Sequence, residues 1–218
     1  MRDSYHEALD SVTDQLVTMM RAVGSMIDRA SSALLDADLG KAESVIAQDE
    51  DIDALALELE ERATDLLALQ QPVATDLRIV TGALRSSATI ERMGDLARHV
   101  AKIARMRYPE CAVPDSVRPI FVEMAAEASL MAARVGDVIA DQNLALALEV
   151  ETLDDRMDDL NVQLLHTLLS GWTGSVDQAV DLTLLSRFYE RYADHAVSMA
   201  RRIVYTMTGT RYDELEKR

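Results

Sequence analysis

The feature that most constrains this 218-residue chain is an acidic motif that occurs twice within long stretches of helical periodicity. Glu-Arg-x-x-Asp spans Glu91–Asp95 and recurs 99 residues later at Glu190–Asp194. A second pattern, Asp-x-x-apolar-Asp, spans Asp49–Asp53 and recurs 105 residues later at Asp154–Asp158. Duplication of one structural unit is the simplest explanation of two motifs that repeat in the same order.

The apolar residues recur at steps of three and four, which is typical of amphipathic helices. Aromatic residues make up only 4% of the chain, and the 8 glycines and 4 prolines give little turn punctuation, so long helices with short loops are favoured. We expect six helices, at about residues 3–35, 41–71, 73–106, 116–141, 144–169 and 176–207.

The clearest break is the segment from Tyr108 to Asp115, which holds two prolines that cannot occupy a helix interior. We therefore predict an all-α fold, a tandem repeat of two antiparallel three-helix bundles. The first bundle is expected at residues 1–108, a linker at 109–115 and the second bundle at 116–218. The charged tail from Tyr212 to Arg218 is expected to fray.

Charge and composition exclude several classes of protein. With 22 basic and 38 acidic residues the net charge is −16, so nucleic-acid phosphates would repel the chain and no nucleic-acid partner is expected. The single cysteine, Cys111, excludes an internal disulfide and a cysteine-based zinc site. The N-terminus is polar and no segment has the roughly 20 apolar residues of a membrane span, which favours a cytoplasmic protein.

The repeated acidic residues are predicted to form two clusters. Residues four apart on a helix share one face, so the two carboxylates of each motif point the same way. Antiparallel packing of the second and third helices of each repeat would then bring two motifs together. The first predicted cluster holds Asp49, Asp53, Glu91 and Asp95, and the second holds Asp154, Asp158, Glu190 and Asp194.

Four converging carboxylates repel one another and require a compensating cation. Arg92 and Arg191 follow the glutamates directly, but adjacent helical residues point about 100° apart, so neither easily neutralises its neighbour. All-oxygen sites suit Mg²⁺, Mn²⁺ or Ca²⁺, and carboxylate clusters also hold iron. His99, two turns beyond Glu91, is a further candidate ligand. The alternative is a solvated acidic stripe without metal.

Three segments resemble the PhoU family of bacterial phosphate-signalling regulators: Gln71–Arg78, Glu91–Asp95 and Glu190–Asp194. The resemblance covers nearly the whole chain. It implies two three-helix bundles whose acidic motifs, in some members, bind multinuclear iron or zinc clusters. It also makes Asp28 and Asp137 weaker candidate ligands. The second motif departs from the family pattern at Tyr192 and Ala193, so the second cluster is expected to be the more altered one.

The resemblance implies a negative regulator of phosphate-starvation signalling and phosphate uptake. Such a protein is expected to be an adaptor between the ATPase subunit of a phosphate ABC transporter and a sensor histidine kinase, at the inner face of the membrane through these partners. A homodimer is expected, and an enzyme is not.

Two alternatives remain open. One is a metal-free helical interaction module. The other is a di-metal carboxylate enzyme, which would need Glu-x-x-His on two helices, a pattern that the sequence lacks.

Overall fold

The computed structural model describes residues 2–215, which form six long helices and one short one. The elements are α1 (Arg2–Asp36), α2 (Leu39–Gln70), α3 (Ala74–Arg107), α4 (Arg118–Asp141), α5 (Leu144–Leu169), α6 (Val176–Thr208) and α7 (Tyr212–Leu215). The six expected helices are confirmed, with bounds that differ from the predicted ones by about two residues at most.

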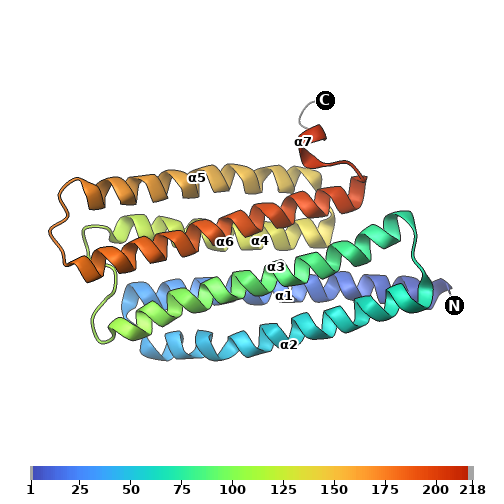
Figure 1. Ribbon diagram of the computed structural model, residues 1–218, viewed down its shortest axis with the longest axis horizontal. Coiled ribbons are helices and arrows are strands. Elements are labelled where there is room, and N and C mark those ends of the chain that lie inside the picture. The colour runs from blue at the N-terminus through green and yellow to red at the C-terminus, as the bar shows by residue number, and fades with distance from the viewer. Residues whose placement is uncertain (1, 216–218) are drawn as a thin grey trace.

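The helices are arranged as two antiparallel three-helix bundles that lie against each other lengthwise (Figure 1). One bundle contains α1, α2 and α3, and the other contains α4, α5 and α6. The bundles meet where α1 packs on α4 and where α3 packs on α6. The predicted all-α tandem repeat is therefore confirmed.

Local side-chain chemistry explains where several helices begin. The carboxylate of Asp38 caps α2 by accepting a 3.0 Å hydrogen bond from the backbone N–H of Lys41. Asn143 caps α5 in the same manner. At α6, Ser175 and Gln178 each bind the other's backbone N–H, which is a capping box. These caps fix the short turns that let neighbouring helices run antiparallel.

Two tyrosines of α6 join the bundles into one core. Tyr189 and Tyr192 are fully buried. The hydroxyl of Tyr189 lies 2.7 Å from that of Ser31 on α1, and the hydroxyl of Tyr192 donates a 3.4 Å hydrogen bond to the backbone oxygen of Val23. Because both rings point toward α1, Tyr192 does not project toward the carboxylates of the second acidic motif.

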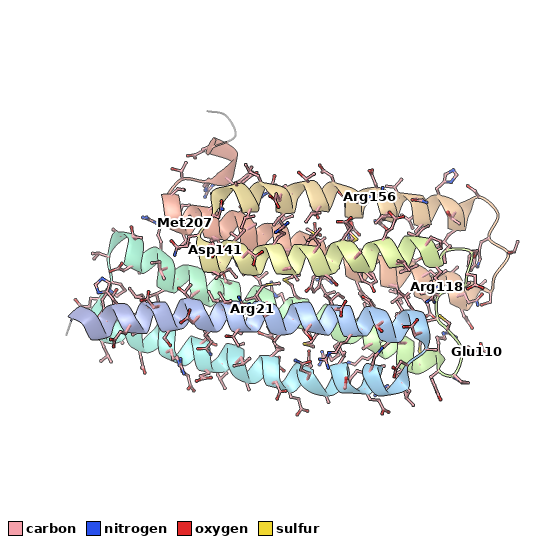
Figure 2. All side chains as sticks on the ribbon, turned by 180° about the vertical axis from the view of Figure 1, so that it is seen from behind. Arg21, Glu110, Arg118, Asp141, Arg156 and Met207 are labelled. Carbon is pink, nitrogen blue, oxygen red and sulfur yellow. The ribbon has the colours of Figure 1, made fainter. Side chains whose placement is uncertain are left out.

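A contact at one end of the molecule also joins the two bundles. Figure 2 shows Arg118 and Glu110 at the end where α3 connects to α4, and Asp141 and Met207 at the opposite end. At the first end, Arg118 donates a 3.1 Å hydrogen bond to the carboxylate of Asp36 and also binds the backbone oxygen of Leu35.

The C-terminal tail corrects one prediction. Instead of fraying from Tyr212 onward, Tyr212–Leu215 form the one-turn helix α7. The side chain of Tyr212 is only 7% exposed, and the guanidinium of Arg201 lies 5.6 Å from the centre of its ring. Residues 216–218 of the predicted tail lie outside the described part. Within residues 2–215, none of the helices is both long and apolar enough to cross a membrane.

Candidate metal centres

The first acidic cluster lies between α2 and α3, and an arginine holds part of it. Asp49 is buried, with 4% of its surface exposed. Arg98 forms ion pairs with both Asp49 on α2 and Asp95 on α3. This guanidinium therefore supplies a positive charge between the two predicted motifs.

Arg98 is the functional residue that the sequence reasoning missed. The sequence motif draws attention to Arg92 and Arg191, which follow the glutamates directly, and not to Arg98. The spacing of Asp95 and Arg98, three residues apart on one helix, was the available signal, because such pairs are neighbours on a helix surface.

The four carboxylates of the first cluster lie near enough for their charges to act on one another. Burial raises the pKa of Asp49, although the neighbouring charge of Arg98 opposes the shift. Burial also raises the pKa of Glu91, and the negative charges of Asp53 and Asp95 raise it further. The charges of Asp53 and Asp95 therefore make ionisation of Asp49 and Glu91 less favourable.

The second cluster, between α5 and α6, is more strongly perturbed. Burial, followed by the charges of Asp158 and Asp194, raises the pKa of Asp154 to about 6. Burial and the charges of Glu190 and Asp194 raise the pKa of Asp158. The structure therefore brings the four residues of the second predicted cluster together as well.

The second cluster differs from the first in its compensation. Glu190 pairs with Arg187 at 2.5 Å, but within the described part of the chain Asp154, Asp158 and Asp194 form no ion pair. The 99-residue offset between the third helices aligns Arg98 with the buried residue Val197. The second repeat therefore has a valine where the first repeat has its compensating arginine.

The two departures of the second motif do not account for this difference. Tyr192 points toward α1, as described above. A Cβ atom on Gly94 would lie 3.5 Å from Ile52 and 3.6 Å from Val23, which are ordinary contacts. The glycine of the first motif thus leaves no more than a methyl-sized space, and Ala193 fills the equivalent position without altering the groove.

The oxygen donors of both clusters suit a hard cation, but the side chains as placed do not form a coordination shell. Within residues 2–215, no group of three or more His, Cys, Asp or Glu side chains is placed closely enough to hold a metal ion. Asp154, Asp158, Glu190 and Asp194 fit a cation best, since within the described residues three of them form no ion pair. A metal at Asp49 and Asp95 would have to displace Arg98.

A groove adjoins the first cluster. Its volume is about 410 Å³, and Asp53, Glu91, Leu57, Glu60 and Leu84 are among the residues that line it. The cluster is thus open to solvent on its α2–α3 side, so an ion can reach it.

The additional candidate ligands lie elsewhere. His99 stacks on Phe188 of α6, with ring centroids 5.2 Å apart, and so faces the other bundle rather than α2. Asp28 is exposed on α1. Asp137 lies 3.7 Å from Arg134 in an ion pair on α4. None of the three joins a cluster as the side chains stand.

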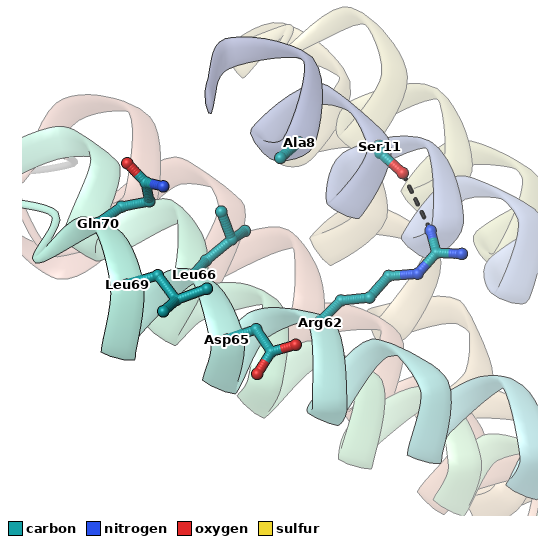
Figure 3. A pocket seen from close by; sticks show the side chains of 7 residues that line it. All are labelled: Ala8, Ser11, Arg62, Asp65, Leu66, Leu69 and Gln70. Atoms are coloured by element: carbon teal, nitrogen blue, oxygen red, sulfur yellow. Dashed lines mark hydrogen bonds between the residues drawn. The ribbon is translucent and has the colours of Figure 1, made fainter. Parts of the chain in front are cut away.

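A separate cavity of about 310 Å³ lies between α1 and α2 (Figure 3). Arg62 crosses it and donates a 3.0 Å hydrogen bond to Ser11. Its other lining residues include Leu66 and Leu69. This cavity contains none of the predicted cluster residues.

Two packed three-helix bundles, each with a carboxylate cluster in its outer groove, define a class of duplicated helical proteins with paired acidic sites. A sequence model described as the PhoU domain matches residues 16–104 and 121–203, one match in each bundle. The chain belongs to the PhoU family.

Named relatives agree with this assignment. The chain is 46% identical over 210 residues to the "Phosphate-specific transport system accessory protein PhoU homolog 2" of Mycobacterium tuberculosis, covering 96% of this chain and 99% of that one. It is 43% identical to the PhoU homolog 1 of Mycobacterium leprae, over 96% of this chain and 95% of the relative.

Solved structures show the same fold. PhoU from Pseudomonas aeruginosa superposes with a TM-score of 0.86 at 26% identity, over 94% of this chain and all of that one. The phosphate transport system regulatory protein PhoU from Streptococcus pneumoniae also has a TM-score of 0.86, at 23% identity over 96% of this chain and 99% of that one. At the lower identity the likeness concerns the fold alone.

Proposed function

We propose that this protein is a cytoplasmic negative regulator of phosphate-starvation signalling and phosphate uptake. In this role it is a non-enzymatic adaptor, a homodimer that joins the ATPase subunit of a phosphate ABC transporter to a sensor histidine kinase at the inner face of the membrane. Its relatives are named as accessory proteins of phosphate-specific transport, which supports the phosphate-related part of the proposal.

The observation that carries the adaptor role is an apolar surface on the second bundle. Six large apolar side chains are exposed along the last turns of α5 and the first turns of α6; we call them the α5–α6 apolar surface. They are Val162, Leu165, Leu169, Val176, Val180 and Leu184. Leu169 is 86% exposed and Val176 is 78% exposed. Contiguous apolar patches of this kind mark protein interaction sites.

Helical spacing explains why these side chains lie together. On α5 they follow one another at steps of three and four, and on α6 at steps of four, so each set occupies one helix face. The hydroxyl of Ser186 donates a 2.5 Å hydrogen bond to the side-chain oxygen of Asn161, which sets the level at which the two helices pair. The surface therefore lies between this contact and the turn that joins α5 to α6.

The first bundle is polar at four of the six equivalent positions, whereas Val162 and Val176 align with the exposed Leu57 and Leu77. The repeat offsets align Leu165 with Glu60, Val180 with Thr81 and Leu184 with Arg85. Since duplicated units begin with equal surfaces, this difference supports distinct roles for the two outer grooves and a partner for the second.

The interaction can be tested by pull-down. We expect Leu165→Asp combined with Val180→Asp to abolish capture of the transporter ATPase or of the cytoplasmic region of the kinase. Leu69→Asp combined with Val73→Asp is the control, since these are the same two residue types at exposed positions of the first bundle. Unchanged capture of both partners by the first double variant, with its helicity intact, would contradict the adaptor surface.

The same proposal includes metal ions at the carboxylate clusters. By family resemblance these are iron or zinc, and the oxygen donors also suit Mg²⁺, Mn²⁺ or Ca²⁺. Protein purified without a tag and without chelators should contain metal, as measured by elemental analysis. Asp154→Asn with Asp158→Asn should lose it, whereas the neighbouring exposed pair Asp155→Asn with Asp159→Asn should not. Metal-free wild-type protein would favour the alternative, an interaction module without metal.

Regulation is tested in the cell. Deleting the gene should derepress phosphate-uptake genes in phosphate-rich medium, and expression of the chain should restore repression. Repression that persists after loss of this gene and of every paralogue would contradict the regulatory role.

A further inference from the structure

Basic residues gather where the third helices of the two bundles meet. Although the chain carries a net charge of −16, α3 has seven arginine or lysine residues and only three carboxylates. Its contact partner α6 has four of each. Figure 1 shows α3 and α6 crossing on the same side of the molecule. These two helices therefore carry 11 of the 22 basic residues of the chain but only 7 of its 38 carboxylates.

Two contacts set the register of this crossing. The guanidinium of Arg202 on α6 donates a 3.0 Å hydrogen bond to the hydroxyl of Thr89 on α3. Nearer the other end, His99 on α3 stacks on Phe188 on α6. Arg92 lies between the two contacts on α3, and Arg191 lies between them on α6. The duplicated motif thus places its arginine from each repeat at the same junction.

The arginines at this junction are not engaged in ion pairs. Within the part of the chain that the structure describes, Arg85, Arg92, Arg191 and Arg202 form no ion pair. This is unexpected in a chain with 38 carboxylates and 22 basic residues. Burial, and then the charge of Arg85, lowers the pKa of Arg202. Several positive charges therefore lie near one another without a direct ion pair, an arrangement that an anion would stabilise.

Two histidines add hydrogen-bonding capacity. The Nε2 atom of His195 and the Nδ1 atom of His99 are buried and have no hydrogen-bond partner in the described structure. The guanidinium groups of Arg191, Arg92 and Arg202 lie close enough to His195 for their charges to act on its ring. An imidazole has at least one N–H to donate in either protonation state.

Two acidic groups border the junction, since the charge of Asp95 acts on His99 and the charge of Asp194 acts on His195. Asp95 is paired with Arg98, and Asp194 belongs to the second carboxylate cluster. The guanidinium groups come from two helices, and together with an imidazole N–H they provide donors from several directions. A phosphate group, with its dense oxygen acceptors, matches such a donor set better than a single carboxylate does.

We propose that the junction of α3 and α6 binds a phosphate group, held by Arg92, Arg191 and Arg202 with His195 and His99 at its base. The group can be free orthophosphate or the phosphate of a nucleotide, since both present the same oxygen atoms. This inference is independent of the adaptor role and of metal at the carboxylate clusters. It gives the protein a direct means of responding to a phosphorylated ligand.

The test is calorimetric titration of chelator-treated protein with orthophosphate and, separately, with ATP, at constant ionic strength maintained with sodium chloride. Chelation removes metal that could itself bind phosphate. Arg92→Gln combined with Arg191→Gln should weaken binding by about tenfold or more, because charge-assisted hydrogen bonds are lost. Arg21→Gln combined with Arg105→Gln removes the same charge from exposed positions and should change the affinity by less than about twofold.

The outcomes separate the two sources of phosphate. Saturable binding of orthophosphate assigns the site to the free ion, and binding of ATP alone assigns it to a nucleotide. Equal weakening in both double variants would show only long-range attraction to net charge and would overturn the proposal. Absence of saturable binding of either ligand by folded wild-type protein would overturn it too. Circular dichroism of each variant verifies that the helices are intact.

Discussion

The hydroxyl of Tyr189 on α6 donates a hydrogen bond to the hydroxyl of Ser31 on α1 across the contact between the two bundles, with 2.7 Å between the oxygens. The direction follows from Ser31, whose own proton is directed to the backbone oxygen of Ile27 at 2.7 Å. Both side chains are buried, so no water competes for this bond. The bundles are therefore joined by a specific polar contact as well as by apolar packing.

Removing that hydroxyl should destabilise the whole chain. For Tyr189→Phe we expect the free energy of unfolding to fall by about 0.5–1.5 kcal/mol, the net value of a typical hydrogen bond. The two bundles should still unfold in one transition because they share a core. Chemical denaturation followed by circular dichroism measures both quantities. Tyr205→Phe, at a 44% exposed residue of the same helix, is the control and should change stability little.

Replacing Arg98 with valine should convert the first cluster into a copy of the second. Asp49 and Asp95 would lose their counter-charge, so the free energy of unfolding of chelator-treated protein should fall by about 1–3 kcal/mol. In compensation, affinity for Mn²⁺ should rise by about tenfold, since no guanidinium competes for the carboxylates. Calorimetry against the control Arg105→Val measures this gain.

The reciprocal change provides a second check on the same mechanism. Val197→Arg introduces a guanidinium at the aligned position of the second repeat, and it should weaken cation binding there. Cation affinity that is unaffected by both substitutions would show that Arg98 does not compete with metal.

Asp154 should make the chelator-treated protein less stable as the pH rises. Its pKa is about 6 in the folded protein and about 3.9 in an unfolded chain. The folded state therefore holds more protons between these values, so stability declines from about pH 4 to pH 6 and then levels off. Asp154→Asn should be more stable than the wild type above pH 6, by a few degrees in Tm, and equal to it below pH 4.

A thermal melting series in the presence of a chelator tests this dependence. Asp10→Asn, at an exposed carboxylate of the first bundle, serves as the control and should keep the wild-type profile. Parallel curves for the wild type and Asp154→Asn across the whole range would refute the assignment.

The fold was predictable because its signals are local. Apolar periodicity and the breaks around Asp38, Pro72 and the Tyr108–Asp115 segment locate the helices, and the repeated motifs locate the partners of each cluster. Compensation by Arg98 was less apparent, since its contact with Asp49 joins residues far apart in sequence. The one-turn helix at Tyr212 depends on packing against Arg201, which no local pattern indicates.

The basic junction of α3 and α6 is likewise not apparent from the sequence. Arg92 and Arg191 are visible in the sequence as parts of the motif, but each alone reads as an exposed helical residue. Only the antiparallel crossing of α3 and α6 places them between the Thr89–Arg202 and His99–Phe188 contacts. Sites made by the meeting of two repeats require the tertiary structure.

The two helical glycines Gly94 and Gly24 should respond oppositely to the same substitution. At Gly94 an added Cβ meets Ile52 and Val23 at ordinary distances of 3.5 and 3.6 Å. Glycine within a helix costs about 0.5–1 kcal/mol relative to alanine, so Gly94→Ala should stabilise the protein by up to that amount. Metal content should not change, because the second repeat already has Ala193 there.

At Gly24 an added Cβ would lie only 3.2 Å from the Cβ of Ala132, where α1 packs on α4. That crowding offsets the helical gain, so Gly24→Ala should be neutral or destabilising in chemical denaturation. Equal stabilisation by both substitutions would contradict the close approach of α1 and α4.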